Sequence, residues 1–123
     1  MKIEVSIGEI ADKYTILKLK LDHIKDVDKF DNVKKEYEYI KKIIKKLEIE
    51  DEKMIIELQA INKNLWEVED AIRACDYKRD FGENFVNLAK QVYHLNDIRA
   101  IIKKQINTKY KSNFVEEKSY HAI

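Results

Sequence analysis

The chain lacks proline altogether and has only two glycines, Gly8 and Gly82. Because these two residue types most often interrupt helices, their scarcity predicts long helices and excludes a loop-rich fold. A single cysteine, Cys75, excludes an internal disulfide framework and suits a reducing compartment, so we expect a cytoplasmic protein. The sequence has neither a signal peptide nor an apolar run long enough to span a bilayer, so we expect no membrane contact.

An excess of charge of one sign is also missing. The chain has 24 lysines and arginines against 23 aspartates and glutamates, a formal net charge of +1. Binding to nucleic acid needs clustered excess base, so we expect no nucleic-acid partner. What the chain does have is 38% charged and 45% apolar residues, a mixture typical of amphipathic helices. A length of 123 residues indicates a single helical domain over residues 1–123.

Apolar residues recur at alternating spacings of three and four along most of the chain, which is the period of an amphipathic helix. This pattern predicts an all-α protein, an antiparallel four-helix bundle with a short polar segment after Asn107. Ser6 and Asp80 each stand three residues before a glutamate, the spacing of a helix-capping box. A polar connection is expected over residues 26–32. The predicted starts of the four helices are Ser6, Val33, Asp51 and Asp80.

The first predicted helix is apolar on two sides. Beside its main seam runs a second stripe that contains Glu9, Asp12, Ile16, Leu19 and His23. A helix of this kind usually touches two neighbours, so we place it centrally or at a contact between two copies. We therefore expect a homodimer through the Ile16 and Leu19 stripe.

Arg99 interrupts the apolar seam of the fourth predicted helix. Proteins supply a partner for a buried guanidinium, and breaking such a pair from one side costs roughly 3–5 kcal/mol. The expected partner is Glu69, with Asp70 next, because Glu69 lies beside the facing seam of the third predicted helix. Two interpretations remain: an ion pair that only fixes helix register, or part of a pocket for an anionic ligand.

Two helix sides contain the candidate binding residues. Trp66, Glu69 and Arg73 share one side of the third predicted helix, and Asn96 and Arg99 share a side of the fourth. If these sides meet, Arg73 and Arg99 would hold an anion and Trp66 would stack on a ring. The expected ligand is then a phosphorylated small molecule, either a nucleotide or a nucleotide sugar. The alternatives are a core role for Trp66 and a non-catalytic, homo-oligomeric helical interaction module.

Acidic pairs give the candidate catalytic and metal-binding residues. In the pocket hypothesis, Glu69 or Asp70 acts as a base or a metal ligand. Glu9 and Asp12 stand three residues apart, as Glu67 and Asp70 do, and such pairs of carboxylates can hold magnesium. Magnesium is therefore the one cofactor that the sequence suggests. The alternative is that these acids cap helices or face solvent.

Four motifs stand out together and span nearly the whole chain: Gly8-Glu9-x-x-Asp12-Lys13, Trp66-x-x-Glu69-Asp70-x-x-Arg73, Asn96-Asp97-x-Arg99-Ala100 and Glu117-Lys118-Ser119-Tyr120. They resemble an uncharacterised family of short bacterial and phage helical proteins, often encoded near sugar-transfer functions, which implies a role in glycan or nucleotide-sugar metabolism. The resemblance also implies ligand-binding roles for Lys13 and Asp97. A more distant similarity is to all-helical nucleoside triphosphate pyrophosphatases, although Asp12 stands where their second helical glutamate would be.

Overall fold

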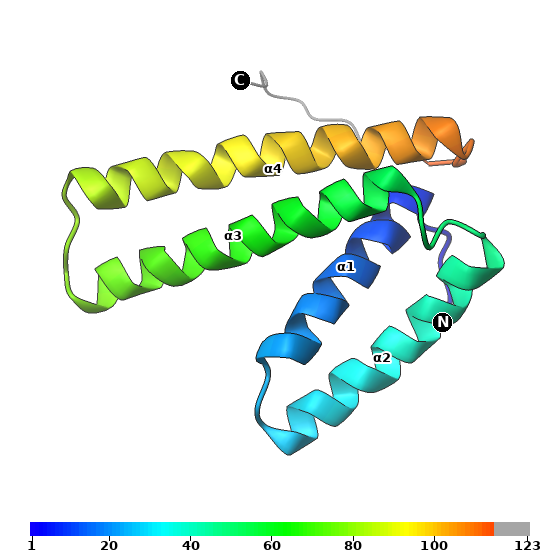
Figure 1. Cartoon of the computed structure of the whole chain (residues 1–123), viewed down its shortest axis with the longest axis horizontal. Coiled ribbons are helices and arrows are strands. Elements are labelled where there is room, and N and C mark those ends of the chain that lie inside the picture. Colours follow the sequence, from blue (N-terminus) through cyan, green and yellow to red (C-terminus); the bar gives the residue numbers. More distant parts are fainter. Residues whose placement is uncertain (115–123) are drawn as a thin grey trace.

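The computed structural model describes residues 1–114, so the part of the predicted polar segment after Phe114, with its motif at 117–120, lies outside the described residues. Residues 1–114 form four helices and no strand, which confirms the all-α, four-helix bundle prediction. Figure 1 shows them in chain order. None of these helices is long and apolar enough to cross a bilayer. The helices are α1 (Ile7–His23), α2 (Val27–Lys46), α3 (Lys53–Tyr77) and α4 (Glu83–Lys109).

The bundle consists of two antiparallel hairpins, α1 with α2 and α3 with α4 (Figure 1). Helix α1 packs against α2, α3 and α4, and is the helix at the centre of the bundle. This confirms the central position predicted from its two apolar sides. The α3–α4 hairpin extends past the α1–α2 hairpin at the end that holds the turn between α3 and α4 (Figure 1). The core cluster draws on all four helices and on the loop after α2, with Leu17, Ile44, Ile49, Leu58 and Ile106 among its least exposed members.

The second stripe of α1 lies inside the chain. Leu19 is buried, and Ile16 and Leu19 face a cavity that residues of α3 and α4 also line. The stripe that we predicted for a homodimer is therefore partly covered by α3 and α4 of the same chain, while Ile16 stays half-exposed, and the homodimer remains a prediction. Periodicity shows that a helix face is apolar, but it does not show whether the same chain or a second copy covers it.

Side-chain caps start the first two helices. Ser6 caps α1 as predicted, because its Oγ accepts a hydrogen bond from the backbone N–H of Glu9 (3.1 Å). Asp26 caps α2 by accepting from the N–H of Lys29 (3.0 Å), so α2 begins at Val27. The polar segment that we predicted as a connection is therefore mostly the exposed first part of α2. Its polarity reflects solvent contact, which sequence periodicity does not distinguish from a loop.

The N-caps of the last two helices lie one and two residues later than the predicted Asp51 and Asp80. Glu52, rather than Asp51, is the N-cap of α3, and its side chain makes no capping hydrogen bond. Gly82 is the N-cap of α4. Asp80 accepts a hydrogen bond from the N–H of Gly82 (3.3 Å) and so orders the turn before α4 instead of capping it.

The N-terminus of α1 is held by the other end of the chain. Asn107 Oδ1 accepts from the backbone N–H of Gly8 (2.6 Å), and Ser112 Oγ accepts from the N–H of Ile7 (3.1 Å). These N–H groups are among those that a helix leaves unpaired at its start. A Cβ at Gly8 would lie 2.5 Å from the backbone oxygen of Lys103 and 2.9 Å from Asn107 Oδ1. Glycine is therefore needed here because the backbones of α1 and α4 approach closely.

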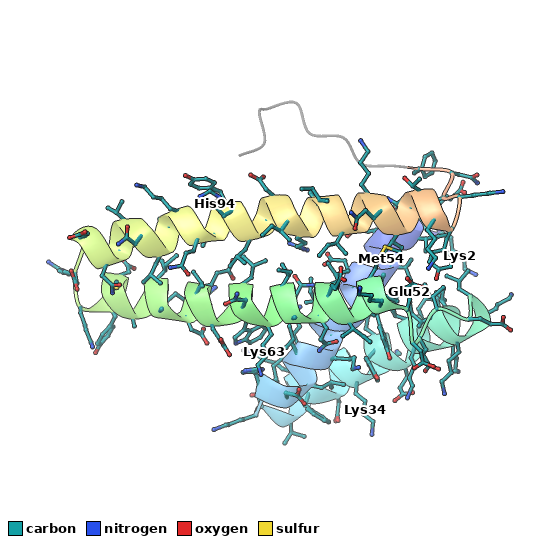
Figure 2. The ribbon with its side chains drawn as sticks, turned by 45° about the horizontal axis from the view of Figure 1, so that its top comes forward. Lys2, Lys34, Glu52, Met54, Lys63 and His94 are labelled. Carbon is teal, nitrogen blue, oxygen red and sulfur yellow. The ribbon has the colours of Figure 1, made fainter. Side chains whose placement is uncertain are left out.

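A second group of side-chain contacts connects the C-terminal end of α4 to the start of α3, where Figure 2 labels Glu52. Lys109 Nζ donates to both Glu52 oxygens (3.0 Å each), and the Tyr110 hydroxyl donates to Oε2. The hydrogen bonds from Tyr110 and then Lys109 favour the ionised carboxylate and lower the pKa of Glu52. The same contacts raise the pKa of Tyr110 and of Lys109, since each group keeps its proton to donate it to Glu52.

Gly8→Ala should destabilise the fold by about 1–3 kcal/mol, because the added methyl group overpacks the contact with α4. Urea unfolding of both proteins measures the difference. Gly82→Ala is the matched control: its Cβ would meet nothing closer than 3.5 Å, so we expect a change below about 1 kcal/mol. Equal effects of the two substitutions would contradict the close approach at Gly8.

Glu52→Gln should remove a pH-dependent part of the stability. The pKa of Glu52 is lowered on folding from its ordinary value of 4.5, so its stabilisation is full above that value and is lost as the pH falls towards the folded pKa. The stability gap between wild type and Glu52→Gln should therefore shrink on acidification below about pH 5. Urea midpoints at several pH values measure it, with Glu57→Gln, an exposed change on the same helix, as control. A stability difference that does not change with pH would contradict the hydrogen bonds of Lys109 and Tyr110 to the ionised Glu52.

Candidate functional site

Arg99 of α4 pairs with a buried acid, as predicted, but the acid is Asp12 of α1. The Arg99 Nε–H donates to Asp12 Oδ1 (2.9 Å), and the Nη2–H donates to Oδ2. Asp12 is only 1% exposed. The predicted pairing of Arg99 with Glu69 or Asp70 is wrong, since residues 1–114 contain no such ion pair. Helix α1 lies against both α3 and α4, and its second stripe carries an acid to the guanidinium.

Asp12 also joins α1 to α3. Asn62 Nδ2 donates to Asp12 Oδ1 (2.9 Å) and to Thr15 Oγ1 (2.8 Å), and Thr15 Oγ1 donates to the Asp12 carbonyl (2.8 Å). Asp12, Thr15 and Asn62 are all buried. We call these three residues and Arg99 the Asp12 network. A single buried carboxylate thus receives hydrogen bonds from α3 and α4 together, as a buried charge requires.

Lys103 extends the contact between α1 and α4 by one helical turn. Its Nζ donates to Glu9 Oε2 (2.8 Å) and lies 3.9 Å from Asp12 Oδ2. The two acids that we predicted as magnesium ligands therefore face lysine and arginine cations. No group of three or more His, Cys, Asp or Glu side chains that could hold a metal occurs in residues 1–114. The donor set around Glu9 and Asp12 does not fit a magnesium site, and we derive no metal chemistry from it.

A cavity of about 230 Å³ lies next to the Asp12 network, where α1 meets α3 and α4. Four residues that the sequence singled out line it together: Trp66, Glu69, Asn96 and Arg99. The pocket predicted between α3 and α4 thus has residues of α1 as a third wall. The full lining is Ile16, Leu19, Lys20, Asn62, Leu65, Trp66, Glu69, Asn96 and Arg99.

Trp66 is half-buried at this cavity and packs against the end of α1. Its indole lies against the ring of His23, with ring centroids 4.6 Å apart and planes inclined by 34°. The His23 ring is itself held, because its Nδ1–H donates to the Leu19 carbonyl (2.7 Å). The indole therefore has a fixed neighbour on one side and contributes to the cavity wall as well.

Other residues predicted for the site lie elsewhere. Asp70 and Arg73 form an exposed pair (3.7 Å), and the Arg73 side chain is 77% exposed. Lys13 pairs with Glu36 of α2 (3.1 Å) and so links α1 to α2. Asp97 is buried but does not line the cavity, and two positions of separation place it on another side of α4 from Arg99. The structure therefore brings none of these predicted residues to the cavity.

Lys20 and Asn62 line the cavity but were not predicted. Lys20 forms no ion pair within residues 1–114, and as one of many lysines on charged helices it gave no sequence signal. Asn62 is 4% exposed and uses Nδ2 for Asp12 and Thr15. Its Oδ1 accepts no hydrogen bond in the described part of the chain, where no fully buried side-chain polar atom lacks a partner. Asn62 Oδ1 therefore keeps some access to solvent, and the residue lines the cavity.

The fold and site define a small helical protein in which buried Asp12 and Asn62 and part-buried Arg99 lie beside a cavity of mixed polar and apolar lining. The chain belongs to DUF6165, a family of unknown function, whose model matches residues 1–123. This confirms the resemblance to an uncharacterised family. No curated protein and no solved structure matches the chain.

Arg99→Met should destabilise the protein by about 3 kcal/mol or more, because it leaves the Asp12 carboxylate buried without its main partner. Asp12→Asn should also destabilise it, since Arg99 loses its acid. The double variant should lose clearly less stability than the sum of the two, because replacing both members of a buried pair removes the uncompensated charge. Urea unfolding of the four proteins gives the coupling free energy. Additive effects would contradict a direct Asp12–Arg99 interaction.

Proposed function

We propose that the cavity between α1, α3 and α4 binds a phosphorylated small molecule. One observation carries the proposal: Lys20 and Arg99 line the same small cavity as the Trp66 indole. An anionic group and a ring of one ligand can therefore be held side by side. Small-molecule sites typically combine apolar walls with a few convergent polar groups, and Ile16, Leu19 and Leu65 supply the apolar part here.

The two cations have different roles in this proposal. Asp12 already balances the charge of Arg99 and fixes the guanidinium in place. Lys20 has no ion-pair partner in residues 1–114, so its charge is the one that a ligand anion would neutralise. Arg99 then orients the anion with donors that need little reorganisation, which favours affinity.

A catalytic step would involve Glu69. Of the two acids predicted as catalytic, only Glu69 lines the cavity, and Asp70 is part of an exposed pair. A general base must lie within hydrogen-bond reach of the proton that it takes. We therefore assign any proton transfer at this site to Glu69 and none to Asp70.

Binding of the ligand should change the fluorescence of Trp66, which is the only tryptophan in the chain and lies in the cavity wall. We would titrate the protein with inorganic phosphate, nucleotides, nucleotide sugars and sugar phosphates, with and without magnesium. The pH is kept constant, so that a change in fluorescence reports the ligand and not a change at the His23 ring that packs on the indole. At least one phosphorylated compound should bind, and Lys20→Gln should weaken it about tenfold, the effect of losing one charge-assisted hydrogen bond.

Lys13→Gln is the matched control for Lys20→Gln. Both lysines are on α1, but Lys13 pairs with Glu36 away from the cavity, so its replacement should leave binding unchanged. If no phosphorylated compound binds wild type, or if both lysine variants bind alike, the proposal fails. The alternative of a non-catalytic interaction module would then be preferred.

A further inference from the structure

The hydrogen-bond acceptors in the cavity restrict what a ligand can be. Asn62 Oδ1 and the Glu69 carboxylate both accept hydrogen bonds, and Asn62 Nδ2 is already used within the Asp12 network. An ionised phosphate group is also an acceptor, so it satisfies neither of them, and the charge of Glu69 repels it. Glu69 is exposed and also meets solvent, but a ligand that brings O–H or N–H donors to this wall, in addition to an anionic group for Lys20, matches the lining better than a simple anion.

The spacing of these acceptors favours several donors on a ring over one donor. Asn62 and Glu69 stand seven residues apart on α3, which is about 10 Å along the helix axis, and Trp66 lies between them. A six-membered ring with hydroxyl groups on opposite sides spans this separation once two hydrogen bonds of about 2.8 Å are included. Its apolar ring face would then lie on the indole.

The size of the cavity points the same way. Its volume of about 230 Å³ lies below the range of roughly 300–1,000 Å³ that is usual for drug-sized ligands. One substituted ring fits this space, whereas the base and further ring of a nucleotide sugar would lie outside it.

We infer that the cavity takes a single hydroxylated ring that carries one anionic group, a sugar monophosphate in chemical class. The inference rests on the proposed function and narrows it. Lys20 binds the phosphate, Trp66 packs on the ring face, and Glu69 and Asn62 accept hydrogen bonds from ring hydroxyl groups. Nucleotides and nucleotide sugars, which the sequence alone allowed, are thereby disfavoured.

The test compares probes by the fluorescence of Trp66 and by calorimetry. The probes are hexose monophosphates of the gluco, galacto and manno series, the free hexoses, inorganic phosphate, uridine monophosphate and uridine diphosphate glucose. At least one hexose monophosphate should bind about tenfold or more tightly than its free hexose, inorganic phosphate and both uridine compounds.

Glu69→Gln separates recognition of the ring from recognition of the anion. It should weaken the hexose monophosphate about tenfold without weakening inorganic phosphate, since phosphate accepts no hydrogen bond from Glu69 and the substitution removes only a repulsive charge. Glu67→Gln is the matched control, an exposed acid on the same helix that does not line the cavity. Lys20→Gln should weaken both probes.

Each outcome decides between the two proposals. If uridine monophosphate binds more tightly than every hexose monophosphate, or if Glu69→Gln binds hexose monophosphate like wild type, the inference about the ring is overturned. The Lys20-dependent phosphate site would survive either result. If wild type binds none of the phosphorylated probes, both proposals fail.

Discussion

The position of α1 in this protein depends on one buried carboxylate. Asp12 is almost fully shielded from water, and an isolated charge in that position would be strongly unfavourable. Its hydrogen bonds come from Arg99 on α4 and Asn62 on α3, so the carboxylate is satisfied only when α1 has one register against the α3–α4 hairpin. A pair of apolar faces would permit sliding by a turn. The Asp12 network does not, because a shift would leave several polar groups unpaired.

The network also accounts for the polar cavity beside it. Arg99 and Asn62 serve Asp12 on one side and line the cavity on the other, so residues that fix the helices supply part of the lining. Towards the start of α1 the same interface closes tightly, because Gly8 permits backbone contact with Lys103. Towards the end of α1, the rings of Trp66 and His23 pack on each other, and Trp66 also lines the cavity. The cavity occupies that wider end.

The sequence was informative about single helices and poor about which helices meet. Spacing of apolar residues placed four helices and identified Arg99 as a cation that needs a buried partner. It assigned that partner to Glu69 because periodicity defines faces within a helix and carries no information on the neighbour of each face. The α1 stripe that holds Asp12 was assigned to a second copy for the same reason. Asn62 was visible only as one member of a polar row, and Lys20 did not differ in pattern from lysines that face solvent.

The charge balance of the site separates folding from binding. If Arg99 were the main anchor of a ligand anion, binding would compete with Asp12 for the same guanidinium and would weaken the contact that fixes α1. Lys20 forms no ion pair within residues 1–114, so it can bind an anion without breaking a contact that stabilises the fold. Because Asp12 balances the charge of Arg99, Lys20 gives this wall of the cavity one net positive charge. Glu69 on α3 places a negative charge in the same lining. A ligand matched to both needs an anionic end and a hydrogen-donating end, which a simple anion lacks.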